Sequence, residues 1–267
     1  MDLSKSKYIL PNLLTLTSVF CGISSIQLAI TAQTAEQLQL AAWLIVAAML
    51  CDLFDGRVAR MTGAQSEFGV QLDSLADAVS FGVAPAMLLY SWGLEPLGVL
   101  GLFFAFVYAG CAIMRLARFN VTAKADGGKS RYFEGLPTPL AAGAVVSIVM
   151  AHLTVTIEPT TGAYWNVAAM SVLMGGLMVS NVRYRTFKDF NVRGRGGLAL
   201  AVMLVVVAGV SVAARPSVAF VTIMVMYIVV GLGGGLVELG RAFFGADAED
   251  HDYLSDPVEA DSTDADQ

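Results

Sequence analysis

Four aspartates lie inside a stretch of the chain that is otherwise apolar enough to enter a membrane. They form two pairs, Asp52 with Asp55 and Asp73 with Asp77. On a helix, residues three or four positions apart share a face, so each pair presents its carboxylates in one direction. Carboxylates at membrane depth are costly unless a positive charge compensates them. Two neighbouring helices would therefore direct four carboxylates to one point, and divalent cations are the simplest compensation.

The composition places this stretch in a polytopic membrane protein. Of the 267 residues, 56% are hydrophobic and only 14% are charged, whereas soluble domains carry about 25% charged residues. A spanning helix needs about 20 mostly apolar residues. We therefore expect an all-α fold with about eight transmembrane helices, near residues 8–30, 39–60, 69–92, 97–119, 136–156, 163–181, 197–214 and 217–240.

The basic residues predict how these helices are oriented. With eight spans and a cytoplasmic N-terminus, Arg215 is the one basic residue of the 16 that falls on the outer side. The positive-inside rule favours this orientation, which directs the aspartates and both termini to the cytoplasm. The expected location is the cytoplasmic (inner) membrane of a bacterium. Nine of the 22 acidic residues lie between Asp247 and Asp266, which predicts a disordered acidic tail.

The residues around the aspartates suit a pyrophosphate. Gly56 and Gly69 would let a bulky charged ligand approach both backbones. Arg60 could hold a phosphate through two hydrogen bonds, and Ser66 could donate another. Helix capping could explain one aspartate, but Arg57 and Arg60 cannot neutralise four. A metal-ion transporter stays open as an alternative, although it explains neither the arginine nor the two glycines.

The pattern Asp-x2-Asp-Gly-x2-Ala-Arg-x8-Gly-x3-Asp-x3-Asp, which begins at Asp52, resembles the motif of the CDP-alcohol phosphotransferases. The resemblance implies a six-helix core that binds CDP-diacylglycerol and two divalent ions, Mg²⁺ or Mn²⁺. It also implies that Asp52 and Asp73 ligate both ions and that Asp55 ligates the first. Asp77 would ligate the second ion and act as the general base.

The same resemblance assigns contacts to the CDP-lipid. The segment 11–15 looks like the nucleotide-side segment of that family. Together with residues of the aspartate motif, it gives a predicted CDP-lipid set of Asn12, Thr15, Gly56, Arg60, Ser66 and Gly69.

The acceptor alcohol depends on other segments. Arg115 and Arg118 are three residues apart, so both could face one anion, although they could equally be flanking charges. The motifs Arg-x-Ala-Arg-Phe-Asn at 115–120 and Phe-x-Gly-Leu-Pro-x-Pro at 133–139 resemble the membrane-embedded phosphatidylserine synthase branch. That branch implies L-serine as the acceptor, and its carboxylate needs polar or cationic partners. The candidates are Arg115, Arg118, Asn120, Arg183 and Lys188.

Alternatives to the serine acceptor remain at this stage. A sibling transferase that uses glycerol 3-phosphate or inositol phosphate would share the metal site. Intramembrane prenyltransferases carry Asn-Asp-x-x-Asp-like motifs on separate helices, and no second motif of that kind occurs in the chain. No nucleic acid is expected as a partner. A homodimer is common in the resembled family, but the glycine-rich run Gly231–Gly235 does not establish it.

The expected domain organisation follows the extent of the resemblance. Residues 1–190 would form the catalytic core, which acts within the lipid bilayer. Residues 191–241 would add two C-terminal transmembrane helices, and residues 242–267 would form the acidic cytoplasmic tail.

Overall fold

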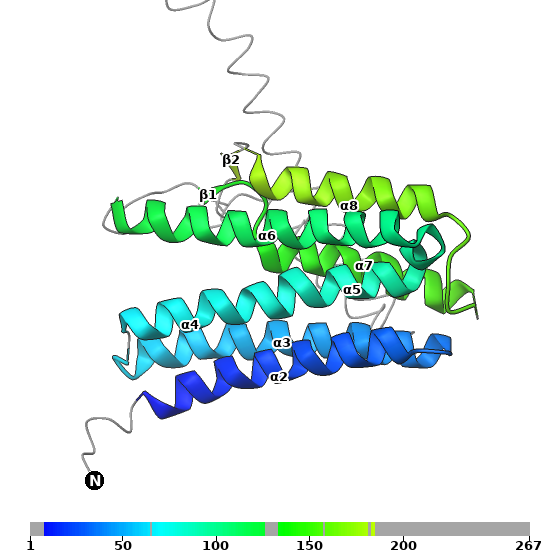
Figure 1. The fold of residues 1–267 in the computed structure, drawn as a ribbon. Helices are drawn as coiled ribbons and strands as arrows, with labels where there is room; N and C mark the ends of the chain where they lie inside the picture. Colours follow the sequence, from blue (N-terminus) through cyan, green and yellow to red (C-terminus); the bar gives the residue numbers. More distant parts are fainter. Residues whose placement is uncertain (1–7, 65, 126–132, 157, 181–182, 185–267) are drawn as a thin grey trace, which may run out of the picture.

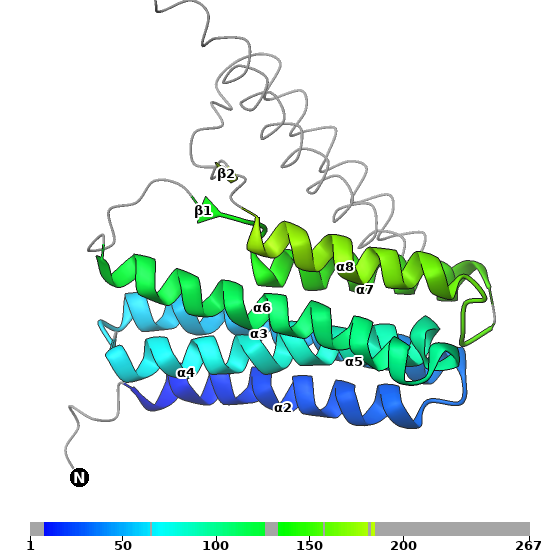
Figure 2. The same ribbon diagram turned by 45° about the horizontal axis from the view of Figure 1, so that its top comes forward.

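The computed structural model describes residues 8–64, 66–125, 133–156, 158–180 and 183–184. Nearly all of these residues are helical, and the helices lie side by side in a bundle (Figures 1 and 2). In chain order the elements are α2 (Ile9–Thr31), α3 (Ala35–Met61), α4 (Glu67–Asp77), the π-helix η1 (Ala78–Val83), α5 (Ala84–Leu89), the π-helix η2 (Tyr90–Leu94), the 3-10 helix η3 (Glu95–Leu97), α6 (Val99–Ala125), the strand β1 (Phe133–Glu134), α7 (Thr138–Val155), α8 (Tyr164–Val179) and the strand β2 (Arg183–Tyr184). The two short strands pair antiparallel.

The helices of the bundle are those of an integral membrane protein. Within the described part of the chain, five segments are long and apolar enough to cross a bilayer: Ile9–Thr31, Ala35–Met61, Glu67–Leu97, Val99–Thr122 and Thr138–Val155. Large apolar side chains such as Phe20, Phe106 and Trp165 are exposed on the outside of the bundle. A surface of this kind suits lipid rather than water as the surrounding solvent.

The core of the bundle forms around the third membrane segment. Phe81, Leu88 and Leu89 of that segment are completely buried. They belong to one cluster with Ile45 of α3, Tyr108 of α6, and Val145, Val149 and Met150 of α7. The third segment is therefore enclosed by neighbouring helices rather than by lipid alone.

The sequence predicted this all-α membrane fold, and six of the eight predicted spans have a helical counterpart among the described residues. The sixth span, near 163–181, corresponds to α8, whose 16 residues are apolar but fewer than a full crossing needs. The predicted spans at 197–214 and 217–240, and the acidic tail, lie outside the described residues. The total of eight spans stays a prediction.

The third predicted span, 69–92, differs from a uniform helix. The structure divides Glu67–Leu97 into α4, η1, α5, η2 and η3, so that π-helical turns interrupt the α-helix twice. Pro85 contributes to the first interruption because it has no N–H to donate to the carbonyl of Phe81. The hydroxyl of Tyr108 donates to that carbonyl instead, at 3.4 Å.

A tight turn between α3 and α4 brings the two aspartate pairs to the same end of the bundle. Gly63 adopts φ +61°, a left-handed conformation that glycine adopts without a steric penalty. The side chain of Ser66 then caps α4 by accepting a hydrogen bond from the backbone N–H of Gly69 at 3.0 Å. The chain reverses direction, and α2 packs against both α3 and α4 while those two helices approach each other little.

Candidate active site

Three of the four aspartates bring their carboxylates together between α3 and α4. One carboxylate oxygen each from Asp52, Asp55 and Asp73 lies within 4.8 Å of the other two. Asp55 is buried, with 5% of its surface exposed, and the other two are half-buried. No lysine or arginine forms a salt bridge with them among the described residues. Three clustered oxygens of this kind match the ligands that Mg²⁺ and Mn²⁺ prefer.

Asp77 lies one helical turn beyond Asp73, at the last position of α4. Its carboxyl is within hydrogen-bonding reach of the carboxyl of Asp52. Arg115 of α6 is near enough to interact electrostatically with Asp77. Asp77 therefore interacts both with the cluster of carboxylates and with a buried cation.

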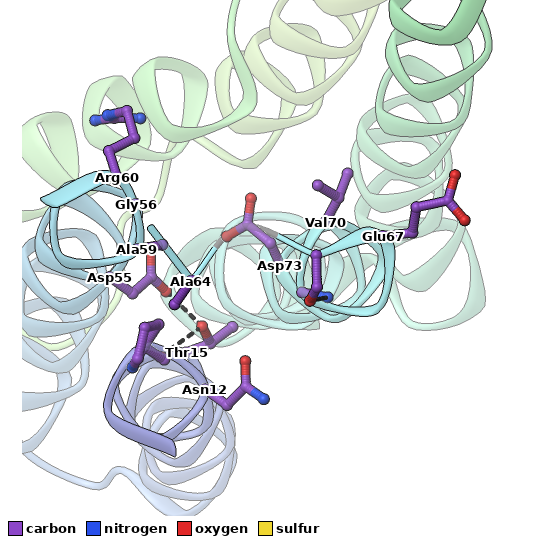
Figure 3. Close-up of a pocket in the computed structure, with 13 residues that line it drawn as sticks. Asn12, Thr15, Asp55, Gly56, Ala59, Arg60, Ala64, Glu67, Val70 and Asp73 are labelled. Carbon is purple, nitrogen blue, oxygen red and sulfur yellow. Dashed lines mark hydrogen bonds between the residues drawn. The ribbon is translucent and has the colours of Figure 1, made fainter. Parts of the chain in front are cut away.

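A hydroxyl of α2 holds one carboxylate in place. Thr15 lies 2.6 Å from Oδ2 of Asp55 and 3.1 Å from the backbone carbonyl of Pro11, and its hydroxyl can donate to either oxygen. Figure 3 shows both contacts at the edge of the cavity. Because Thr15 is itself buried, this contact restricts the position of the Asp55 carboxylate from the side of α2.

A cavity of about 580 Å³ opens beside these carboxylates. Its lining contains every member of the predicted CDP-lipid set: Asn12, Thr15, Gly56, Arg60, Ser66 and Gly69. Arg60 rises from the end of α3 on one side, and Asn12 lies across from it on α2 (Figure 3). A cavity of this volume suits a small-molecule ligand or the head group of a lipid.

The two glycines of the cavity differ in what surrounds them. A Cβ on Gly69 would approach Oγ of Ser66 to 3.2 Å and thereby disturb the cap of α4. A Cβ on Gly56 would lie 3.6 Å from Nη1 of Arg60, an ordinary contact distance. The sequence predicts that Ser66 donates a hydrogen bond to a bound phosphate. The structure adds that its side chain caps α4.

The cavity also includes residues that sequence reasoning did not single out. Besides Asp55 and Asp73, which the sequence did single out, these are Pro11, Ala59, Ala64, Glu67 and Val70. Ala59 belongs to the aspartate motif, so its position was a usable signal. Pro11 likewise lies in the segment 11–15 that the sequence linked to the nucleotide. Ala64, Glu67 and Val70 line the cavity because the turn between α3 and α4 folds back toward α2, which the local sequence does not specify.

The predicted acceptor residues have separate surroundings. Arg115 is buried, and its Nη1 donates to the hydroxyl of Thr138 at 3.3 Å, whereas its Nε has no hydrogen-bond partner among the described residues. Nη1 of Arg118 donates to the carbonyl of Val179 at 3.3 Å. The two guanidinium groups therefore contact different helices, α7 and α8, although the residues are only three positions apart.

Asn120 contacts the helix that carries two of the aspartates. Its Nδ2 donates to Oγ of Ser74 at 2.9 Å, and Oγ of Ser74 donates back to Oδ1 of Asn120 at 3.1 Å. Arg183 lies in β2, opposite Glu134, and Lys188 lies outside the described residues.

Known proteins resemble this chain over most of its length. A model of the family described as CDP-alcohol phosphatidyltransferase matches residues 8–180. The CDP-diacylglycerol–serine O-phosphatidyltransferase of Helicobacter pylori is 35% identical over 226 residues, which cover 84% of this chain and 90% of that protein. The Bacillus subtilis protein of the same name is 34% identical over 179 residues, covering 67% of this chain and 91% of its own. In Saccharomyces cerevisiae the protein so named is 44% identical over 115 residues, or 41% of each chain.

Proposed function

Because this chain belongs to the CDP-alcohol phosphatidyltransferase family, we propose that it transfers the phosphatidyl group of CDP-diacylglycerol to the hydroxyl of L-serine. The products are phosphatidylserine and CMP. The similarity to proteins named CDP-diacylglycerol–serine O-phosphatidyltransferase, over most of both chains, carries this proposal. The cluster of carboxylates from Asp52, Asp55 and Asp73 and the nearby Arg60 also support it, because metal ions and guanidinium groups both bind pyrophosphate.

The proposed cofactor is a pair of divalent ions, Mg²⁺ or Mn²⁺. Asp52 and Asp73 would hold both ions, Asp55 would hold the first, and Asp77 would hold the second. The gathered oxygens of three of these residues fit hard cations. When bound, the ions supply positive charge that stabilises the pyrophosphate and the departing CMP.

The side chains of the protein have separate proposed roles in the reaction. Asp77 accepts the proton of the serine hydroxyl, and the serine oxygen then forms a bond to the phosphorus of the phosphatidyl group. The bond from that phosphorus to the oxygen of CMP breaks, and CMP leaves with the electron pair. Arg60 orients the phosphates from the cavity wall. Asn12, Thr15, Gly56, Ser66 and Gly69 complete the proposed CDP-lipid site.

Two observations support Arg115 as a contact of the acceptor. It is buried next to Asp77, and its Nε is available for a hydrogen bond. A buried N–H without a partner costs free energy, and the carboxylate of serine would remove that cost. The proposed acceptor set also includes Arg118, Asn120, Arg183 and Lys188.

Replacing Arg115 with glutamine is expected to raise KM for serine about ten- to a hundred-fold, which corresponds to the loss of one charged hydrogen bond. KM for CDP-diacylglycerol should stay within about two-fold of the wild type, a change worth only a few tenths of a kcal/mol. Steady-state rates with serine and with serinamide, which lacks the carboxylate, measure the effect. The variant should discriminate between these acceptors less than the wild type does.

Arg57→Gln serves as the matched control, because Arg57 is exposed and lies outside the cavity lining. An unchanged preference of Arg115→Gln for serine over serinamide would remove Arg115 from the carboxylate site.

The proposed membrane placement follows from the charge distribution. Both termini would lie in the cytoplasm, and the membrane would be the cytoplasmic (inner) membrane of a bacterium. The division into a core at 1–190, two further helices at 191–241 and a tail at 242–267 is part of the same proposal. A homodimer is also proposed from the family resemblance, and the mass of the protein in detergent tests it.

One incubation tests the proposed function directly. Purified full-length protein with CDP-diacylglycerol, Mn²⁺ and labelled serine should form labelled phosphatidylserine together with an equal amount of CMP, and a chelator should stop both. Product formed with glycerol 3-phosphate or inositol phosphate but not with serine would instead indicate a sibling transferase. Metal flux into vesicles without release of CMP would favour a transporter.

A further inference from the structure

The helix that carries Asp73 and Asp77 changes its hydrogen-bond pattern immediately after Asp77. The α-helix α4 ends at that residue, and the π-helix η1 begins at Ala78. A π-helical turn accommodates more residues than an α-helical turn, so it alters the direction in which neighbouring side chains point. Such turns are uncommon and depend on the surrounding structure to hold them.

On the side facing α2, the π-helix is held through Ser80. Its hydroxyl donates to the backbone carbonyl of Ser18 at 3.0 Å and accepts from the hydroxyl of Ser18 at 3.3 Å. Both serines are buried, with exposures of 0% and 2%. Gly22 makes this close approach feasible, because a Cβ there would lie 2.9 Å from Cα of Ser80.

On the side facing α6, two further hydrogen-bonded contacts hold the same segment. The buried hydroxyl of Tyr108 donates to the carbonyl of Phe81, within the π-helix. The reciprocal pair of Ser74 and Asn120 holds α4 before the π-helix begins. The segment that contains Asp77 is therefore held at both ends. Before Asp77 it is bonded to α6 through Ser74, and after Asp77 it is bonded to α2 through Ser80 and to α6 through the carbonyl of Phe81.

We propose that Ser74 and Ser80, three residues before and after Asp77, are positioning residues that set the direction of the Asp77 carboxylate. This inference rests on the proposed function, in which Asp77 takes the proton from the acceptor hydroxyl. Neither serine needs to touch the substrate for this role. A displacement of a catalytic group by about 1 Å can reduce a rate by roughly a hundred-fold, so the anchors affect turnover rather than substrate binding.

Ser80→Ala in the full-length protein is the direct test. We expect kcat to fall about ten- to a hundred-fold, within the range for a misplaced catalytic group. The KM values for CDP-diacylglycerol and serine should stay unchanged. Ser80→Cys keeps a weak donor of similar shape and should recover part of the rate. Ser18→Ala keeps the carbonyl that accepts from Ser80, so its loss should be smaller than that of Ser80→Ala.

Ser25→Ala provides the matched control. Ser25 lies on α2, is completely buried and donates to the carbonyl of Ala41 at 2.8 Å, near the other end of the helix. Its replacement removes a similar hydrogen bond and should lower the melting temperature without changing kcat. Equal losses of kcat in Ser25→Ala and Ser80→Ala, or unchanged kcat in Ser80→Ala, would overturn the inference and leave the proposed function intact.

A measurement without substrate tests the anchoring role of Ser80 independently of the proposed function. Backbone amides of Ala78–Val83 should exchange hydrogen faster in Ser80→Ala than in the wild type, whereas Ser25→Ala should leave them unchanged. A wild-type protein that releases no CMP with serine would refute the proposed function. In that case faster exchange in Ser80→Ala would still support the anchoring role, and unchanged exchange would refute it.

Discussion

Replacement of Asp77 with asparagine is expected to lower the turnover rate about a thousand-fold, in the middle of the range attributed to a positioned general base. Asparagine keeps an oxygen in nearly the same place but cannot accept the proton of the acceptor hydroxyl. CDP-diacylglycerol should still bind, because the cavity that surrounds Arg60 remains intact. Single-turnover rates and equilibrium binding of CDP-diacylglycerol, measured on one preparation, distinguish these effects.

Glu95→Gln is a suitable control for Asp77→Asn. It also converts a carboxylate to an amide in the same membrane segment, but Glu95 is exposed in η3, near the opposite end. It should retain wild-type turnover. If Asp77→Asn weakens CDP-diacylglycerol binding as much as it slows turnover, Asp77 is a binding residue and the base lies elsewhere.

Replacement of Asp52 with alanine is expected to reduce activity to the level of wild-type protein in chelator. Asp52 lies at the centre of the acidic group, since its carboxylate gathers with those of Asp55 and Asp73 and also reaches Asp77. Its loss removes a ligand proposed for both ions. Activity as a function of Mn²⁺ concentration measures the effect, and a variant that remains active in chelator would contradict the metal assignment.

Thermal stability gives a second readout for Asp52 that does not require turnover. Mn²⁺ should raise the melting temperature of the wild type, because an ion that binds only the folded state stabilises it. Asp52→Ala should lose most of this increase. Without metal, the variant should melt above the wild type, because it has one fewer carboxylate in a group of like charges. Glu95→Ala should keep the metal-dependent increase.

The location of the candidate site could be predicted from the sequence because the relevant distances are short along the chain. The spacings of Asp52 with Asp55 and of Asp73 with Asp77 assign each pair to one helical face. The turn that contains Gly63 and Ser66 is short enough to bring α4 back to the same end as α3. Local periodicity and one turn therefore account for most of the arrangement.

Contacts between distant segments could not be predicted in the same way. Arg115 and Arg118 share a helical face by spacing, yet one donates to Thr138 of α7 and the other to Val179 of α8. The partners follow from how α7 and α8 pack against α6, which no local pattern of α6 encodes. The same holds for Asn120, whose hydrogen bonds to Ser74 depend on the position of α4.

The π-helix after Asp77 could not be predicted either, because the sequence carries no pattern that is specific to it. Residues 78–84 are almost entirely apolar or small, so their hydrophobic periodicity does not distinguish an α-helix from a π-helix. Pro85 indicates a disturbance without specifying its form. The form depends on Ser18, Gly22 and Tyr108, which lie on two other helices.

The length of the third membrane segment has a consequence for how a lipid would reach the carboxylates. Glu67–Leu97 comprises 31 residues, or roughly 45 Å at the rise of an α-helix, against about 30 Å of hydrocarbon. If its buried apolar part, with Phe81, Leu88 and Leu89, fills that thickness, the proposed membrane placement would put Asp73 near the lipid phosphates. A diphosphate attached to a lipid already resides at this depth. Such a molecule could slide sideways into the bundle without being lifted out of its leaflet.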